Sequence, residues 1–141
     1  METIIVYTDG GARGNPGPAG IGIYITDAAG NMISEYAQAI GNATNNFAEY
    51  QAVATALSLL KKTYGKRTKE IQFIFRLDSE LVQKQLSGEY QIKDAGLVPL
   101  FIEIHNLRVS AFPHLTFTHI PRAQNKDADR LVNEALDAAG A

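Results

Sequence analysis

The chain has 141 residues, of which 45% are hydrophobic and 20% charged, so we expect one globular domain over residues 1–141. It has no cysteine, which excludes disulfide frameworks, thiol catalysis and thiolate zinc sites. A formal net charge of −2 gives no support to nucleic-acid binding by itself. Because no apolar run could cross a membrane and no targeting segment is recognisable, we expect a soluble, cytoplasmic, unprocessed protein without a membrane partner.

The first forty residues have the pattern of three strands. Residues 4–8 form a short apolar run, and isoleucines alternate with smaller or polar residues over 21–26, the period of a half-buried strand. Gly30-Asn31 marks a hairpin turn, after which residues 32–40 return as the third strand. Since the connections are short, these strands should form an antiparallel meander.

The remaining chain alternates between helical and strand patterns. We expect helices over 46–64, 79–86, 97–109 and 126–139, and strands over 71–77 and 115–118. A strand–helix–strand order implies right-handed crossovers and parallel pairing with the first strand. The sequence therefore predicts an α/β fold, with a mixed five-stranded sheet flanked by helices.

Four acidic residues stand where a packed core would not place them. Asp9 and Asp78 each follow an apolar strand, so parallel pairing would bring them together at the sheet edge. Glu49 shares a helical stripe with the apolar residues of 52–60, and an inward charge needs a partner or a metal. Asp129 borders the apolar stripe of the last helix. Crowded carboxylates repel one another unless cations bind between them, and all-oxygen sites suit magnesium or manganese.

Simpler interpretations exist for each of these features. Asp78 and Ser79 would make a good helix N-cap. Glu49 is expected in the first turn of a helix, where the helix dipole favours an acid. The dipole does not explain why the Glu49 side chain would point toward the sheet. Asp129 taken alone would be a surface acid at a helix start. The basic residues of 61–69 follow a helix, so dipole compensation and a solvated loop explain them.

The motifs together resemble type 1 ribonucleases H. The resemblance rests on Tyr7-Thr8-Asp9-Gly10-Gly11, Arg13-Gly14-Asn15-Pro16-Gly17, Thr44-Asn45-Asn46, Ala48-Glu49-Tyr50, Asp78-Ser79, Asn125 and Ala128-Asp129, in family order. The match spans nearly the whole chain, and residues 119–125 are most similar to the short, archaeal-type branch. The resemblance implies the ribonuclease H-like fold, in which three antiparallel strands precede the parallel ones.

The resemblance also implies an endonuclease that hydrolyses the RNA strand of RNA–DNA hybrids and leaves 5′-phosphate and 3′-hydroxyl ends. Asp9, Glu49, Asp78 and Asp129 would hold two Mg²⁺ ions, and Mn²⁺ should also support activity. The implied substrate contacts are Gly10, Gly11, Asn15, Thr44, Asn45, Asn46, Ser79 and Asn125. Amide and backbone groups can select RNA by hydrogen bonding its 2′-hydroxyl in the shallow minor groove. No obligate protein partner is implied, so we expect a monomer. The similarity to the archaeal-type branch also makes double-stranded RNA a possible second substrate.

Three departures from the family pattern affect substrate binding. The basic handle that many bacterial relatives insert after the third carboxylate is missing, since residues 86–97 contain only Lys93. A catalytic-loop histidine is replaced by Arg122, which we favour over His119 as its counterpart. Glu80 stands where the family usually has glutamine, and an acid beside a polyanion is unfavourable.

Other proteins use the same fold for different tasks. Integrases, resolvases and exonucleases share it but usually carry extra DNA-binding segments or different acid spacing. A hybrid-binding module without catalysis is a further alternative. Such degenerate members typically lose an acid, whereas all four acids are present in this chain.

Overall fold

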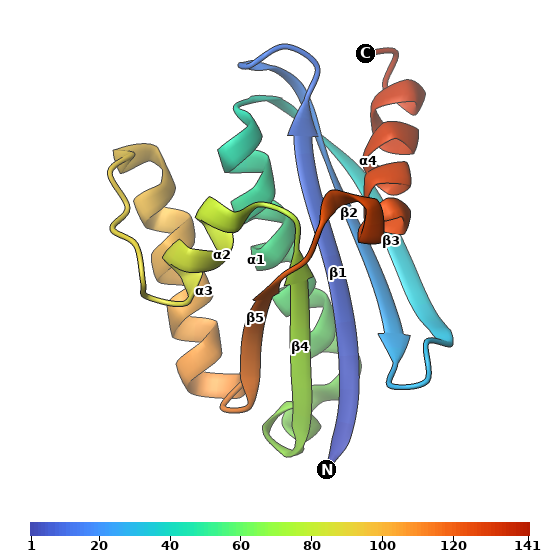
Figure 1. Ribbon diagram of the computed structural model, residues 1–141, viewed down its shortest axis with the longest axis vertical. Helices are drawn as coiled ribbons and strands as arrows, with labels where there is room; N and C mark the ends of the chain where they lie inside the picture. Colours follow the sequence, from blue (N-terminus) through green and yellow to red (C-terminus); the bar gives the residue numbers. More distant parts are fainter.

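The computed structural model describes residues 1–141, which build one five-stranded sheet in the order β3-β2-β1-β4-β5 (Figure 1). The strands are β1 (Glu2–Ala12), β2 (Gly17–Asp27), β3 (Met32–Ala43), β4 (Ile71–Leu77) and β5 (Leu115–His119). The pairs β1–β2 and β2–β3 are antiparallel, whereas β1–β4 and β4–β5 are parallel. The predicted mixed sheet, with a meander followed by parallel strands, is therefore confirmed.

The helices cover the two faces of this sheet unequally (Figure 1). They are α1 (Asn45–Tyr64), α2 (Glu80–Leu86), α3 (Val98–Ala111) and α4 (Lys126–Ala138), with short 3-10 turns η1 (Gly65–Glu70), η2 (Ala95–Leu97) and η3 (Arg122–Gln124). The main core contains buried residues of α1, α2, α3 and the sheet, but none of α4. Helix α4 buries its own apolar stripe on the opposite face, against β2 and β3.

Glycines let the helices approach the sheet closely on both faces. The β1–β2 ladder continues through Gly10↔Ile21 and Gly11↔Gly20, so both strands extend beyond the predicted bounds. A Cβ atom at Gly10 would collide with the backbone carbonyl of Ala48 in α1, and one at Gly22 with that of Ala128 in α4. Only glycine fits such approaches. As a result, the starts of α1 and α4, which carry Glu49 and Asp129, lie against β1 and β2 respectively.

The basic segment 61–69 lies far from the predicted acidic site. Its residues precede β4, whereas Asp78 follows that strand, so the two occupy opposite ends of the sheet. Lys61 and Lys62 lie in the last turn of α1, and Arg67 pairs with Glu2 at 2.8 Å. These positions agree with dipole compensation and a solvated loop. No helix combines the length and apolarity that a membrane span requires.

Candidate active site

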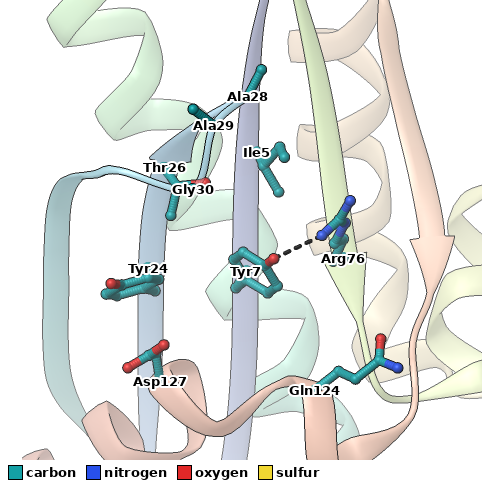
Figure 2. A pocket seen from close by; sticks show the side chains of 10 residues that line it. All are labelled: Ile5, Tyr7, Tyr24, Thr26, Ala28, Ala29, Gly30, Arg76, Gln124 and Asp127. Carbon is teal, nitrogen blue, oxygen red and sulfur yellow. Dashed lines mark hydrogen bonds between the residues drawn. The ribbon is translucent and has the colours of Figure 1, made fainter.

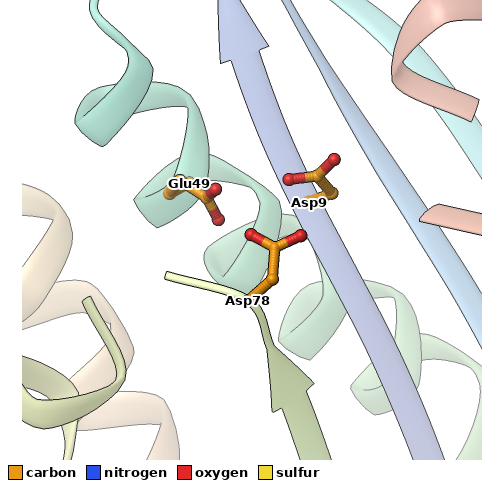
Figure 3. Close-up of side chains that lie close together, drawn as sticks. All are labelled: Asp9, Glu49 and Asp78. Atoms are coloured by element: carbon orange, nitrogen blue, oxygen red, sulfur yellow. The ribbon is translucent and has the colours of Figure 1, made fainter. Parts of the chain in front are cut away.

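Three of the four predicted acids meet at the carboxyl ends of β1 and β4 (Figure 3). Asp9 lies on β1, Asp78 directly follows β4, and Glu49 projects from α1 toward both strands. One carboxylate oxygen from each of them lies within 4.8 Å of the others. The parallel pairing of β1 with β4 and the close approach of α1 at Gly10 bring these acids together.

Two of the three carboxylates are buried. Asp9 and Glu49 each have only 7% of their surface exposed. An Asp9 carboxylate oxygen accepts a hydrogen bond from the Gly10 amide at 3.0 Å, whereas Glu49 Oε2 has no hydrogen-bond partner. Helix α1 begins at Asn45, so Glu49 lies beyond its first turn and dipole compensation does not explain it. A buried, unpartnered carboxylate oxygen facing two further acids is an arrangement that a bound cation satisfies.

Burial and mutual repulsion make these acids hard to ionise without a cation. Burial raises the pKa of Asp9 to about 7, and the nearby Asp78 carboxylate adds to the rise. Burial also raises the pKa of Glu49 well above its usual value, with further contributions from Asp9 and Asp78. A divalent cation reverses both effects, because it favours the ionised carboxylates that bind it.

Asp78 is held by Asn125 and does not cap a helix. The Asn125 amide nitrogen donates to the Thr8 carbonyl at 2.9 Å and to Asp78 Oδ2 at 3.1 Å. The N-cap of α2 is Ser79, whose hydroxyl accepts from the Val82 amide at 3.2 Å. The predicted N-cap at Asp78-Ser79 is therefore confirmed for Ser79, whereas Asp78 is left for the acidic site. Asn125 is only 1% exposed, so it acts on the site through Asp78 and does not face the solvent as a substrate contact would.

A cavity of about 390 Å³ adjoins the three acids and includes the fourth. Asp129, Arg122, Gly10, Gly11 and Asn45 line it together with them. Asp129 lies outside the close group of three carboxylates, but its charge contributes to the raised pKa of Asp9. His119, at the end of β5, does not line this cavity, whereas the exposed Arg122 does.

Asparagines of the β1–β2 loop and of the first turn of α1 form an exposed amide rim, which we define as Asn15, Asn45 and Asn46. The Asn15 side-chain oxygen accepts from the Asn45 amide at 3.0 Å, and the Asn45 side-chain oxygen accepts from the Ala12 amide at 2.8 Å. Both side-chain NH₂ groups therefore remain available as donors. Thr44 is the N-cap of α1, with its hydroxyl accepting from the Phe47 amide at 3.1 Å, and Asn46 lines a neighbouring cavity.

Sequence reasoning missed a tether between the β1–β2 loop and α4. The Arg13 guanidinium contacts the Asp137 carboxylate at 2.8 Å and the Asn133 side-chain oxygen at 3.2 Å. It also donates to the Ala141 carbonyl at 2.6 Å. An arginine within a glycine-rich motif gives no sequence signal of partners more than a hundred residues away, because those partners depend on how α4 docks.

Carboxylates gathered at the ends of parallel strands, on this sheet order, define a metal-dependent nuclease of the ribonuclease H-like fold. A family described as reverse transcriptase-like matches residues 7–135. LC11-RNase H1, isolated from compost by a metagenomic approach, is 48% identical to this chain, with a TM-score of 0.95 and 100% coverage of both chains. The chain thus belongs to the type 1 ribonuclease H family.

Curated relatives support the same family but are longer proteins. Ribonuclease HI of Halobacterium salinarum is 41% identical over 133 residues, which cover 94% of this chain and 64% of that protein. The bifunctional protein Rv2228c of Mycobacterium tuberculosis is 39% identical over 137 residues, or 96% of this chain and 36% of that protein. The chain therefore spans about a third of the mycobacterial protein and less than two thirds of the archaeal one.

Proposed function

We propose that this protein is a ribonuclease H that cleaves the RNA strand of RNA–DNA hybrids with two bound Mg²⁺ ions. The observation that carries the proposal is the close group of Asp9, Glu49 and Asp78, whose carboxylate oxygens approach within 4.8 Å of one another. LC11-RNase H1, of which this chain covers 99% at 47% identity, has been crystallised in complex with an RNA/DNA hybrid. A nearly superimposable fold with such a carboxylate group is the basis for carrying that substrate over to this chain.

The donor set fits magnesium, because every candidate ligand is a carboxylate oxygen. Asp9, Glu49 and Asp78 would hold the ions, and Asp129 would complete the set from α4. Bound ions would lower the pKa of an attacking water and stabilise the leaving 3′ oxygen. Asn125 fixes the orientation of Asp78 by donating to its Oδ2 atom. Arg122, which lines the same cavity, would contribute positive charge beside the scissile phosphate.

The amide rim provides a physical basis for selecting RNA. Because the side-chain oxygens of Asn15 and Asn45 are already hydrogen bonded, each residue presents its NH₂ group outward. Such donors match the 2′-hydroxyl and base acceptors of a wide, shallow minor groove. The peptide groups of Gly10 and Gly11 and the polar groups of Thr44, Asn46 and Ser79 would add contacts around this rim. Glu80 is exposed and lies 4.0 Å from Lys84, which partly offsets its repulsion of phosphates.

The deciding assay uses labelled RNA–DNA hybrid, duplex RNA and duplex DNA, each with magnesium, manganese or excess chelator. We expect endonucleolytic cleavage of the RNA strand of the hybrid only when a divalent ion is present, with 5′-phosphate ends. Cleavage that persists in chelator would exclude the two-metal mechanism, and equal cutting of duplex DNA would exclude the proposed substrate. The duplex RNA arm tests the possible second activity, and sedimentation of the same sample tests the expected monomer.

A further inference from the structure

A second cavity, of about 350 Å³, lies on the α4 face of the sheet and has no part in the function proposed above (Figure 2). Its floor is formed by Ile5, Tyr7 and Tyr24 of β1 and β2, and Arg76 of β4 forms one side. Gln124 and Asp127, from the turn before α4 and the start of that helix, complete the wall. The volume lies within the range of small-molecule sites.

Arg76 is a half-buried cation without an acidic partner. The structure gives it one hydrogen bond, from Nη1 to the Tyr7 hydroxyl at 2.7 Å, and places its guanidinium carbon 5.5 Å from the Tyr7 ring centroid. By contrast, Arg13, Arg67 and Arg130 all pair with carboxylates at 2.8–2.9 Å. Partly desolvating a charge is costly unless an opposite charge or several acceptors compensate it. The remaining guanidinium donors of Arg76 are available to a ligand.

Other hydrogen-bond donors around the same cavity also lack protein partners. Neither the Tyr24 hydroxyl nor the Gln124 side-chain amide has a hydrogen bond in the structure, and both residues line the cavity. Helix α4 begins without a side-chain N-cap, so amides of its first turn are also free. The one acid present, Asp127, is about half exposed and faces Arg130 at 3.6 Å. Arg76 is thus the one charged residue lining this cavity that has no oppositely charged partner.

We propose that this cavity is an anion-binding site, centred on Arg76, that takes a phosphate group. An arginine presents a planar fork of donors that matches phosphate oxygens in pairs. Phosphate carries acceptors on all sides, so Gln124, which lies on the same side of Tyr7 as Arg76, can bind oxygens that Arg76 does not reach, whereas the Tyr24 hydroxyl points away from Arg76 (Figure 2). The tyrosine rings beside the anion position offer a flat, largely apolar surface, which a nucleotide would use and free phosphate would not.

The turn that closes this cavity also belongs to the carboxylate site. Arg122 lines the cavity beside the acids, Asn125 holds Asp78, and Gln124 between them lines the cavity of Arg76. An anion bound by Gln124 would therefore order the segment that presents Arg122. The two sites remain distinct, because no residue lines both cavities.

The test is calorimetric titration of inorganic phosphate into the metal-free protein at fixed ionic strength, with a nucleoside monophosphate and acetate as parallel arms. We expect saturable phosphate binding that Arg76→Met weakens by about tenfold or more, since bonds to charged groups contribute at least that much. Arg67→Met, which removes an exposed arginine outside the cavity, is the matched control and should bind as the wild type does. Tighter binding of the nucleotide than of free phosphate would identify a nucleotide as the source of the group.

Two outcomes would overturn the proposal. One is phosphate binding that is undetectable in the wild type, and the other is binding that survives Arg76→Met unchanged. If Arg76→Met does not fold, as judged by circular dichroism, Gln124→Ala replaces it and should weaken binding by a few fold. Phosphate should also shift the Arg76 Nε–H resonance in the wild type, and an unshifted resonance would exclude the site.

Discussion

The carboxylate half and the amide half of the active site are held in place by different forces. Asp9 and Glu49 are buried, and their positions follow from backbone packing, with Gly10 against the Ala48 carbonyl. The amide rim is exposed, and hydrogen bonds between the start of α1 and the end of β1 with its following loop hold it, from Asn45 to Asn15 and from Ala12 to Asn45. A packed arrangement tolerates no intruding atom, whereas a hydrogen-bonded rim can lose one contact and keep the others. Substitutions in the carboxylate half should therefore abolish activity, whereas substitutions in the amide half should only reduce it.

The largest effect should come from removing one charge in the carboxylate half. Asp78→Asn keeps the shape of the side chain but removes the negative charge that a metal needs, so several kcal/mol of transition-state stabilisation are lost. We expect hybrid cleavage to fall by about a thousandfold or more. Single-turnover cleavage rates measure this effect. Glu80→Gln is the control, since it removes an exposed acid and should retain or improve activity; equal inactivity of both variants would contradict the assigned metal set.

The next largest loss of activity should come from removing the side chain of Asn125. Asn125→Ala removes the hydrogen bonds to the buried Thr8 carbonyl and to the half-buried Asp78 carboxylate. Losing a group that orients a metal ligand typically costs about 10–100-fold in activity. Titration of magnesium against the initial rate should show a weaker apparent metal affinity. A variant with unchanged metal affinity and full activity would mean that Asp78 needs no such support.

Packing is tested by a pair of neighbouring glycines. In Gly10→Ala the new methyl group would collide with the Ala48 carbonyl, so α1 must move and carry Glu49 with it. We expect a loss of roughly 1–3 kcal/mol in the free energy of unfolding. In Gly11→Ala the added Cβ would lie 3.9 Å from Val132 Cγ1, an ordinary contact, so stability should hardly change. Urea unfolding of both variants decides this, and equal stability would contradict the close approach of α1.

In the amide half, Asn45→Ala should reduce activity less than the substitutions in the carboxylate half do. It removes the acceptor for the Ala12 amide and one outward NH₂ group, while Asn15 and Asn46 remain. We expect KM for the hybrid to rise by about fivefold, corresponding to one hydrogen bond of roughly 1 kcal/mol, with kcat little changed. Steady-state kinetics separate the two constants. A collapse of kcat as severe as that of Asp78→Asn would remove the distinction between the halves.

The smallest effect concerns stability without metal. The pKa of Asp9 in the folded protein, about 7, exceeds its ordinary value of 3.8, so folding favours the protonated acid. The stabilisation linked to that proton is complete below about pH 4 and is lost as the pH rises through 7. Asp9→Asn has no such carboxyl group and does not lose this stabilisation. At pH 8 in metal-free buffer we expect its free energy of unfolding to exceed that of the wild type by an amount on the order of 1 kcal/mol.

Thermal melts between pH 4 and 8, at fixed ionic strength, measure that difference. Magnesium should raise the Tm of the wild type more than that of Asp9→Asn and close the gap, because it binds only the folded site. A wild type that is more stable than Asp9→Asn at pH 8 without metal, and indifferent to magnesium, would contradict a crowded metal site.

The sequence predicted the order of the elements and the meeting of Asp9, Glu49 and Asp78, because both depend on periodic patterns and strand ends. It placed the end of β1 too early and the start of β2 too late, since the glycines of 10–22 have the composition of a loop, although here they let helices touch the sheet. It named Asn125 as a substrate contact, which stays a prediction, but gave no sign that this side chain is buried and donates to Asp78. Long-range hydrogen bonds of this kind depend on how α4 docks, which no local pattern encodes.

The separation of the basic segment 61–69 from the acids has a consequence for encounter rates. The lysines lie before β4 and the carboxylates beyond it, so the molecule carries a charge dipole along that strand. A polyanion approaching the metal-free protein is attracted to the lysine end and repelled from the catalytic end. Two divalent ions would neutralise the four carboxylates at that end and remove this repulsion. Under the proposed function, metal binding would therefore change the orientation in which a nucleic acid first collides with this protein, before any bond is broken.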